Sequence, residues 1–436
     1  MKILHYALGF PPYRTGGLTK YCTDLMLTQK EQGHYVGLLW PGQITFLGKK
    51  VYIRKHFDWK GIQNFELINP LPVALDEGII DIDVYTAKCV NPEVYKSFIL
   101  EYKPDVIHIH TLMGLHQEAV DIMINLGVKT VFTTHDYYGI CPKVTLYHNG
   151  SVCVDDHNCE DCISCNKSAL SLKKITILQS PLYRAMKNSW IVKKLRNEHR
   201  KTFFGEQEEV SSGLEDKNRG IQYEVLRSYY CSILEKIDFI HFNSTVTERI
   251  YRKYITPKNC KVISITHRDI ADCRTIKDFD HNILKLTYLG PVKPFKGFQY
   301  LISVLDELWT ELNGKFELHL YSITNIKRQY ISHMQDGYPY SELKEIFENT
   351  DLLVVPSQWY ETYGFTVLEA LSHGVPTLVT EKVGAKDLVS DKFITSNDEL
   401  KNAIRACVMN RQLLVEENKR IRLANLPIAG REELIY

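Results

Sequence analysis

The sequence predicts an α/β protein made of two Rossmann-like, doubly wound domains. Short runs rich in Val, Ile and Leu recur along the 436 residues, and stretches with helical spacing of apolar residues follow them. This alternation is typical of parallel sheets covered by helices on both faces. The length corresponds to two or three domains at about 150 residues each. The runs are Lys2–Leu8, Tyr35–Leu39, Val106–His110, Thr130–Thr134, Phe239–Phe242, Val262–Ile265, Leu284–Leu289, Phe316–Tyr321, Leu352–Val355 and Thr377–Val379.

The runs fall into two groups. The first group predicts an N-terminal domain over residues 1–267, whose first helix begins near Leu18. A stretch of different composition, about residues 140–232, is predicted to be an insertion in it. The polar, aperiodic stretch 268–283 is predicted to be a linker. A second domain over 283–415 and a C-terminal helix over 416–436, packing back on the first domain, complete the expected architecture.

The composition excludes several classes of protein. Charged residues are balanced, with 53 Lys+Arg against 52 Asp+Glu, so the whole molecule has no net attraction to nucleic acid or an anionic membrane. Apolar residues (44%) and charged residues (24%) are near globular averages, which excludes a disordered or collagen-like chain. No apolar stretch approaches the ~20 residues of a membrane span. The N-terminus is too short for a signal peptide, so a cytoplasmic protein with reduced thiols is expected.

Three turns from strand to helix contain candidate site residues, because ligands of open α/β sheets bind beyond the carboxyl ends of strands. Gly16 and Gly17 open a helix and allow a phosphate close to its N-terminus, or they simply make a tight turn. Lys293 and Lys296 follow the strand that ends near Gly290. They suit a diphosphate, although a solvated basic loop is the alternative.

The third turn has the most specific pattern. It follows the run Leu352–Val355 and opens a helix near Gly364, with Gly374 at the C-terminal cap. Glu361 on the loop and Glu369 on the helix are predicted to face one cleft, where carboxylates accept hydrogen bonds from sugar hydroxyls. The amides of Thr362–Thr366 are expected to hold phosphate. A surface helix with two solvated glutamates is the alternative.

These motifs resemble those of family-four retaining glycosyltransferases (glycosyl transferases group 1) with the GT-B fold. The resemblance rests on the spacing of Glu361 and Glu369, the Gly290 to Gly297 loop, the Gly16-Gly17 turn and Thr134-His135-Asp136. It implies two domains facing a cleft, a UDP- or GDP-sugar donor held mainly by the second domain, and an acceptor bound by the first. It also implies retention of anomeric configuration without a catalytic metal.

The resemblance also implies a role for each matching residue. Glu369 would bind the donor ribose, Glu361 would lie near the donor sugar, and Lys296 would stabilise the leaving diphosphate. His135 would contact the transferred sugar. Three residues would therefore be catalytic: Glu361, His135 and Lys296. The implied donor-binding residues are Gly16, Gly17, Gly290, Lys293, Lys296, Thr362, Gly364, Phe365, Thr366 and Glu369.

Two positions depart from the family pattern. Pro291 stands where the family usually has Arg, and Lys293 would replace it as a point charge rather than a bidentate fork. Thr266-His267-Arg268-Asp269 stands where the family often has an Asn-Gly turn.

Five of the eleven cysteines lie together in the predicted insertion: Cys141, Cys153, Cys159, Cys162 and Cys165. The CxxCxxC spacing allows neighbouring thiolates to share one ion, so four of the five are predicted to hold a structural zinc. An iron–sulfur cluster is an alternative, and unligated thiols are another.

Residues 171–201 are strongly basic and also carry an apolar stripe that includes Leu182 and Trp190. A basic amphipathic helix of this kind can lie on the inner face of an anionic membrane, or it can pack on the first domain with its lysines solvated. No nucleic-acid motif accompanies the basic residues.

The sequence therefore predicts a cytoplasmic or peripheral membrane transferase that extends a saccharide or a lipid-linked oligosaccharide during surface polysaccharide biosynthesis. A nucleotide-sugar epimerase of the same fold, or a nucleotide-sugar-binding protein without turnover, is the alternative.

Overall fold

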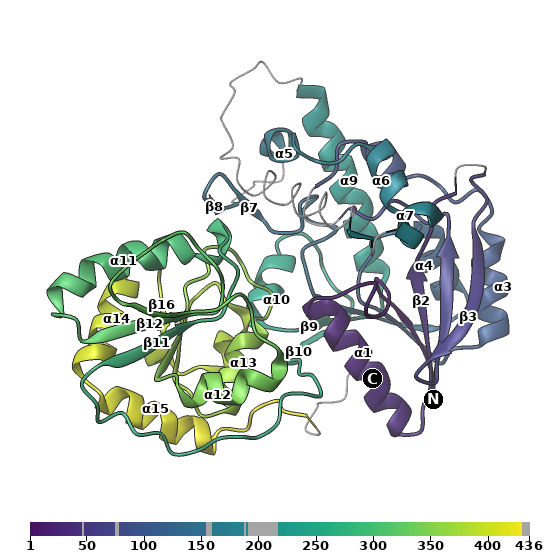
Figure 1. Cartoon of the computed structure of the whole chain (residues 1–436). Coiled ribbons are helices and arrows are strands. Elements are labelled where there is room, and N and C mark those ends of the chain that lie inside the picture. Colours follow the sequence, from purple (N-terminus) through teal and green to yellow (C-terminus); the bar gives the residue numbers. More distant parts are fainter. Residues whose placement is uncertain (46–47, 75–77, 154–158, 187–188, 191–216, 430–436) are drawn as a thin grey trace. The chain divides into compact units, whose positions relative to one another are not determined.

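The computed structural model describes residues 1–45, 48–74, 78–153, 159–186, 189–190 and 217–429 (Figure 1). The chain divides into two compact units. The first comprises residues 1–149, 153–242 and 249–261, and the second comprises 150–152, 243–248 and the residues from 262 onward.

The first unit is built on an eight-stranded sheet in the order β10-β9-β6-β5-β1-β2-β4-β3. The central strands are parallel, whereas β3 pairs antiparallel with β4 at the edge. Every residue of β5 is buried, as expected for a strand covered on both faces. The strands are β1 (Lys2–Tyr6), β2 (Tyr35–Pro41), β3 (Tyr52–Trp59), β4 (Ile62–Ile68), β5 (Val106–Ile109), β6 (Lys129–Thr133), β9 (Phe239–Phe242) and β10 (Cys260–Val262).

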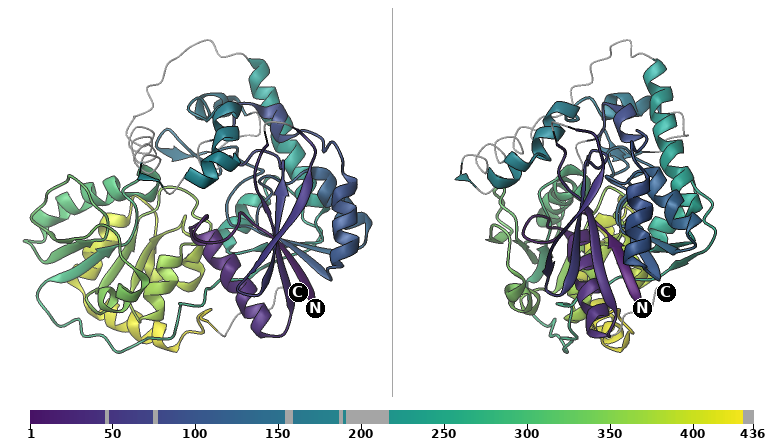
Figure 2. Two further views of the ribbon diagram at one scale, coloured as in Figure 1. Left: turned by 45° about the vertical axis from the view of Figure 1, so that its right-hand side comes forward. Right: turned by 90° about the vertical axis from the view of Figure 1, so that its right-hand side faces the viewer.

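Helices cover both faces of this sheet. Helix α1 contacts β2 and β4, while α3, α4 and α9 contact one another in series on the other side (Figures 1 and 2). The strand order runs in opposite directions on the two sides of β1, and right-handed crossovers then place the helices on opposite faces of the sheet. The helices of this unit are α1 (Gly17–Glu31), α2 (Ile82–Tyr85), α3 (Glu93–Tyr102), α4 (Gln117–Asn125), α5 (Glu160–Cys165), α6 (Leu172–Leu178), α7 (Pro181–Met186) and α9 (Lys217–Lys236). Helix α10 (Thr245–Tyr251) begins in the second unit and ends in the first.

The start of the basic segment packs on the first sheet. The guanidinium of Arg184 in α7 lies 2.6 Å from Glu66, a fully buried carboxylate of β4, and 4.6 Å from the ring of Trp40. The Gln179 side chain accepts a hydrogen bond from the amide of Val73. A buried carboxylate requires such a partner, so α7 is fixed to the sheet. Lys187 and residues 191–201 lie outside the described residues.

The second unit is built on a parallel sheet in the order β13-β12-β11-β14-β15-β16. Figure 1 shows α11 on one side of it and α12 and α13 on the other. The strands are β11 (Leu284–Tyr288), β12 (Phe316–Leu320), β13 (Ile331–Met334), β14 (Leu352–Val355), β15 (Thr377–Thr380) and β16 (Ile394–Thr395), and two further short strands, β7 (Tyr147–His148) and β8 (Ser151–Val152), form a separate sheet. The helices are α11 (Phe298–Glu311), α12 (Leu343–Glu348), α13 (Phe365–Ser372), α14 (Leu400–Met409) and α15 (Gln412–Leu423), with one-turn helices η1 (Pro294–Lys296), η2 (Tyr340–Glu342), η3 (Gly384–Leu388) and η4 (Asp391–Phe393).

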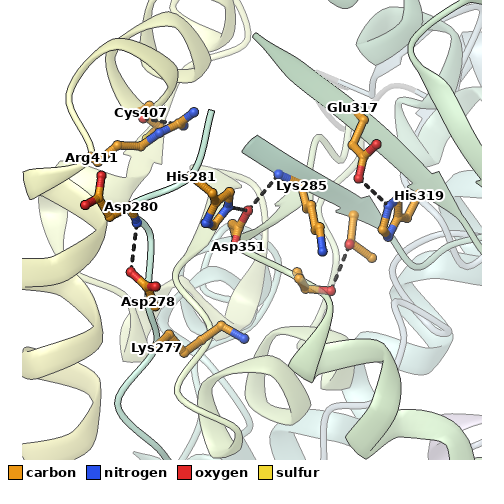
Figure 3. A network of polar contacts seen from close by, with 12 residues as sticks. Lys277, Asp278, Asp280, His281, Lys285, Glu317, His319, Asp351, Cys407 and Arg411 are labelled. Atoms are coloured by element: carbon orange, nitrogen blue, oxygen red, sulfur yellow. Dashed lines mark hydrogen bonds and ion pairs between the residues drawn. The ribbon is translucent and has the colours of Figure 1, made fainter. Parts of the chain in front are cut away.

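The stretch 268–283, which was predicted to be a linker, belongs to the second unit. The amide of Cys273 donates to the carbonyl of Ser372, and Lys277 donates to the carbonyl of Phe347. Asp351 accepts hydrogen bonds from His281 and from the amide of Lys285, both at 2.7 Å (Figure 3). Backbone and charged groups therefore fix this polar stretch to the second sheet, although it lacks helical or strand periodicity.

Three predicted boundaries also need correction. The second unit begins at Val262 rather than after 267, and the strand expected at Val262–Ile265 is β10, Cys260–Val262. The C-terminal helix is α15, which begins at Gln412 and ends at Leu423. Residues 430–436 lie outside the described residues. Among the helices of the described parts, none is long and apolar enough to cross a membrane.

Candidate active site

The loop after β11 presents Lys296 on a short helical turn. The carbonyl of Gly290 accepts a hydrogen bond from Ser322, and the carbonyl of Pro291 accepts one from Tyr288 at 2.9 Å. Both bonds fix the start of the loop. Lys293 then precedes the turn η1, which ends at Lys296, and Gly297 follows with φ +76°. Hydrogen bonds therefore hold the loop just before the two lysines.

The loop after β14 is held against the loop after β11. The amide of Gln358 donates to the carbonyl of Phe295 at 2.8 Å. A side chain at Gly297 would overlap the carbonyl oxygen of Pro356, so only glycine permits this approach. Two strand ends that are adjacent in the sheet thus bring their loops into direct contact.

The contact places Lys296 beside Glu361. The Lys296 ammonium lies 2.6 Å from Oε1 of Glu361, and the Ser357 hydroxyl donates to Oε2 at 2.6 Å. Both charged side chains keep some exposure, 21% for Lys296 and 13% for Glu361. The ammonium also lies 5.2 Å from the ring of Trp359. The pair is therefore oriented from several sides and still accessible to a ligand.

The N-terminus of α13 adjoins this pair. Gly364 is its N-cap, with φ +98°, and a Cβ placed there would lie 3.6 Å from the carboxylate of Glu361. Within the described residues, no side chain caps the helix. The first amides, at Phe365 and Thr366, therefore keep the donor capacity and positive dipole end that favour an anion. Thr362 lies on the same loop, where its carbonyl accepts a hydrogen bond from Ser244.

Glu369 lies further along α13 in a separate polar group. Its side chain is nearly buried, the Tyr340 hydroxyl donates to Oε1 at 2.8 Å, and Nε2 of His267 lies 3.5 Å from the same oxygen. Burial and the neighbouring Glu369 carboxylate raise the pKa of Tyr340 well above its ordinary value, so this tyrosine stays a hydrogen-bond donor. The His267 ring also packs edge-on against Phe365.

Sequence reasoning missed Ser357, Tyr340 and His267 as parts of this site. Ser357 was within the motif, but its contact with Glu361 depends on the loop conformation. Tyr340 comes from η2, far from α13 in the sequence, and no spacing pattern connects them. His267 was noted only as a departure from the family pattern.

The first unit carries the remaining predicted residues. Gly16, with φ +110°, is the N-cap of α1, and Gly17 is its first residue. His135 follows β6, and its Nε2 lies 3.2 Å from Nδ1 of His110. Burial lowers the pKa of His135 to about 3, so its ring is neutral near pH 7. The ring of Tyr21, one turn into α1, lies 4.9 Å from it.

The structure shows no disulfide bond at any of the five clustered cysteines, which all lie within the described residues. The Cys159 and Cys162 thiols are hydrogen-bonded to each other, which raises the pKa of Cys162 above its usual range, and Arg227 donates to Cys162 at 3.9 Å. The groups of three candidate ligand atoms that lie within 4.8 Å of one another in the described residues come from the histidines and Cys22 instead. The insertion thus brings two thiols into contact, whereas a structural zinc site needs four ligands.

A comparison with protein families matches residues 271–423 to glycosyl transferases group 1. This part of the chain, about a third of its length, is therefore similar to a group 1 glycosyl transferase domain. It contains Lys293, Lys296, Glu361 and Glu369, and it therefore confirms the predicted resemblance.

Solved structures confirm the GT-B fold class over the whole chain. Sucrose-phosphate synthase from Thermosynechococcus elongatus matches with a TM-score of 0.53 and 12% identity, covering 97% of this chain and 94% of that chain. Anabaena HepE, solved with UDP and glucose, matches with a TM-score of 0.51, 14% identity and the same coverages. WaaG, a glycosyltransferase involved in lipopolysaccharide biosynthesis, matches with a TM-score of 0.51 and 14% identity, covering 97% of this chain and 94% of that chain.

A curated relative comes from Klebsiella pneumoniae, an uncharacterized 42.6 kDa protein in the cps region. It is 22% identical over 307 residues, which cover 70% of this chain and 63% of the relative. The match thus spans less than two thirds of the relative's length.

Proposed function

We propose that the protein is a retaining glycosyltransferase that moves a sugar from a UDP- or GDP-sugar to a saccharide or lipid-linked acceptor during surface polysaccharide biosynthesis. The observation that supports it most is the Lys296–Glu361 pair beside the open N-terminus of α13, within a group 1 domain. The binding of UDP by HepE and the cps-region location of the Klebsiella relative support the donor class and the pathway.

The proposed chemistry follows from where charge develops. As the bond between the sugar and the diphosphate breaks, negative charge grows on the leaving phosphate. The Lys296 ammonium and the first amides of α13 stabilise that charge, without the need for a catalytic metal. Glu361 accepts hydrogen bonds from the donor sugar and offsets positive charge at its anomeric carbon. Glu369, oriented by Tyr340, binds the ribose hydroxyls, and Gly290 and Lys293 line the approach to the phosphates.

The test is donor turnover by the full chain. The enzyme should release nucleoside diphosphate faster when a saccharide or lipid acceptor is added, and turnover should persist in a chelator. Glu361→Ala should lower the rate of release by about 10²–10³-fold while the protein stays folded. An altered sugar formed without acceptor would instead indicate an epimerase, and donor binding without turnover would indicate a binding protein.

We also propose that the insertion contacts the inner face of an anionic membrane. Leu182 and Trp190 are 68% and 74% exposed, and the basic residues Lys173 and Lys174 belong to the same segment. Trp190→Ser should weaken sedimentation with phosphatidylglycerol vesicles. The matched control is Ile276→Ser in the second unit, where a comparably exposed apolar side chain is removed. Equal binding by both variants would contradict the proposal.

A structural zinc held by four of the five insertion cysteines remains part of the proposal. The contact between Cys159 and Cys162 supports it, and Arg227 beside them would balance thiolate charge. Elemental analysis of protein purified without added metal should find about one zinc per chain. Stably folded protein without zinc would contradict this assignment.

A further inference from the structure

The hairpin of β3 and β4 presents an aromatic side chain to solvent. Phe57 is 98% exposed, more than any other large apolar side chain of the described residues. It belongs to β3, which lies at the edge of the first sheet and pairs with β4 alone among the described strands. Single exposed apolar residues are common, so the case for a partner rests on how this ring is held and on what surrounds it.

An irregularity of the strand fixes the backbone at Phe57. The pairing of β3 with β4 shifts its register between His56 and Trp59, as in a β-bulge. The side-chain amide of Asn64 donates to the carbonyl of Phe57 at 3.3 Å, and the Asn64 oxygen accepts from the indole of Trp40 at 2.8 Å. Bulges at the edges of sheets re-aim side chains. The fold therefore holds this backbone in place while the ring stays outside the core.

The tip of the hairpin is also anchored. Lys60 and Gly61 form its two-residue turn, with φ of +49° and +79°. The Lys30 ammonium of α1 donates to the carbonyl of Lys60 at 2.7 Å. The ring of Trp59 stacks on that of Phe10, with 4.5 Å between their centroids. The hairpin is thus fixed at its tip as well as at the bulge, so the exposed ring is not part of a loose loop.

The hairpin is strongly basic, although the whole chain has a net charge of only +1. Residues 49–60 contain five lysines and arginines against one acidic residue. Within the part of the chain that the structure describes, none of the five is paired with a carboxylate. Their charge therefore attracts an anionic surface locally. The exposed charged residues are Lys49, Lys50, Arg54, Lys55, Asp58 and Lys60.

An anionic bilayer fits this combination better than a folded protein does. A stable protein interface needs about 800 Å² of complementary surface on each partner, whereas one phenyl ring offers about 200 Å². Lipid phosphates are mobile, so they can meet basic side chains that are spread along a strand. The boundary between headgroups and acyl chains accommodates an aromatic ring without a shaped pocket.

We propose that the β3–β4 hairpin docks on an anionic bilayer, with the ring of Phe57 at the boundary of the acyl chains and the basic side chains of residues 49–60 on lipid phosphates. This contact uses a different element from the one proposed for the insertion, and it does not depend on sugar transfer. The two elements are neighbours in the first unit, because Arg184 of α7 and His56 of β3 each lie 2.6 Å from the carboxylate of Glu66.

Sedimentation of the full chain with vesicles tests the contact. Vesicles that contain phosphatidylglycerol should bind the protein, and vesicles of phosphatidylcholine alone should bind it far less. Phe57→Ser should lower the partition coefficient about tenfold, since the ring no longer leaves water, and Phe57→Trp should preserve it. Ile276→Ser removes a 77% exposed side chain of the second unit and should have no effect. The Phe57 variants should keep the wild-type urea midpoint, because this ring is not packed in the core.

The charges are tested in the same assay. Lys49→Glu/Lys55→Glu should lower the partition coefficient by about tenfold or more, because each basic residue near an anionic surface adds to the attraction. The matched control is Lys315→Glu/Lys327→Glu, which makes the same change of charge at two exposed lysines of the second unit. Equal losses in the two double variants would show that net charge alone matters and would overturn the hairpin contact.

The remaining outcomes separate this contact from the other proposals. Equal binding by Phe57→Ser and Ile276→Ser would overturn it, and so would equal binding to the two kinds of vesicle. A loss in Trp190→Ser without a loss in Phe57→Ser would support the insertion and refute the hairpin, and the reverse result would refute the insertion. Vesicle binding through Phe57 by a protein without sugar transfer would refute the proposed function but not the hairpin contact.

Discussion

Lys296 and Glu361 are brought together by the contact between two loops, and each depends on the other for its orientation. In the proposed reaction Lys296 stabilises the leaving group, and Glu361 holds both the sugar and Lys296. Removing either side chain should therefore lower kcat by about 10²–10³-fold. Groups that act as a unit are not additive, so the double variant Lys296→Ala/Glu361→Ala should be no slower than the slower single variant.

A double-mutant cycle on kcat checks this coupling. The matched control is the pair Lys344 and Glu348 on α12, an exposed ion pair at 3.9 Å, whose removal should leave kcat unchanged. Strictly multiplicative losses at Lys296 and Glu361 would show that the two side chains act independently.

A second prediction at the scale of residues concerns Tyr340 and Glu369. Tyr340→Phe removes the hydroxyl that orients Oε1 of Glu369, so the donor KM should rise several-fold with little change in kcat. Glu369→Ala should raise the donor KM further. Tyr300→Phe is the control, because that hydroxyl donates to Asn397 in the same unit and touches neither glutamate. Initial rates measured against donor concentration give the KM. Equal KM values for Tyr340→Phe and wild type would show that Tyr340 does not contribute to donor binding.

Sequence reasoning predicted Lys296, Glu361 and Glu369 as site residues because each lies in or next to a strand-to-helix turn and matches a motif of the family that the chain resembles. It could not find the contact of Tyr340 with Glu369 or that of His110 with His135. Those contacts join side chains from elements that are separate in the sequence, and only the folded chain brings these elements together.

At the scale of elements, Gly297 allows η1 to approach the loop after β14. Gly297→Ala would strain a residue at φ +76° and push Pro356 away, whereas Gly337→Ala has a similar φ of +71° and open space around it. The backbone strain should cost about 1–2 kcal/mol in both. Gly297→Ala should lose about 2 kcal/mol more, as overpacking does.

Urea unfolding of both variants measures this difference. Turnover of Gly297→Ala should also fall, because Lys296 moves with the loop. Equal unfolding free energies for the two variants would mean that the loop contact adds nothing to stability.

The strands were predictable where they are buried on both faces. β5, β14 and β15 have continuous apolar runs and were found, whereas β3 is mostly exposed at the sheet edge and was missed. The stretch 268–283 was taken for a linker because its contacts are made by backbone and charged groups, which leave no periodic pattern.

At the scale of the whole molecule, the buried histidines predict acid sensitivity. Burial lowers the pKa of His5 and His116 to about 4 and of His135 to about 3 in the folded state, against 6.5 for the free ring. Below pH 6.5 the unfolded chain therefore binds protons that the folded chain does not. Each ring should reduce the free energy of unfolding by about 1.4 kcal/mol per pH unit down to its folded pKa.

Asp136 opposes this trend, because burial raises its pKa to about 6 and its protonated form is favoured in the folded state. The histidines outnumber it, so the urea midpoint should decrease as the pH is lowered from 7.5 to 5. His116→Gln should flatten the dependence without abolishing it. A midpoint that is equal at both pH values would show that these rings are not buried and neutral.

The stereochemistry of the product tests the proposed reaction most directly. The full chain would be incubated with a nucleotide sugar and an acceptor, and the new linkage would be examined by NMR alongside the nucleoside diphosphate released. We predict one diphosphate per linkage formed and an anomeric configuration equal to that of the donor. An inverted linkage, or sugar transfer without matching release of diphosphate, would contradict a retaining transferase built on Lys296 and Glu361.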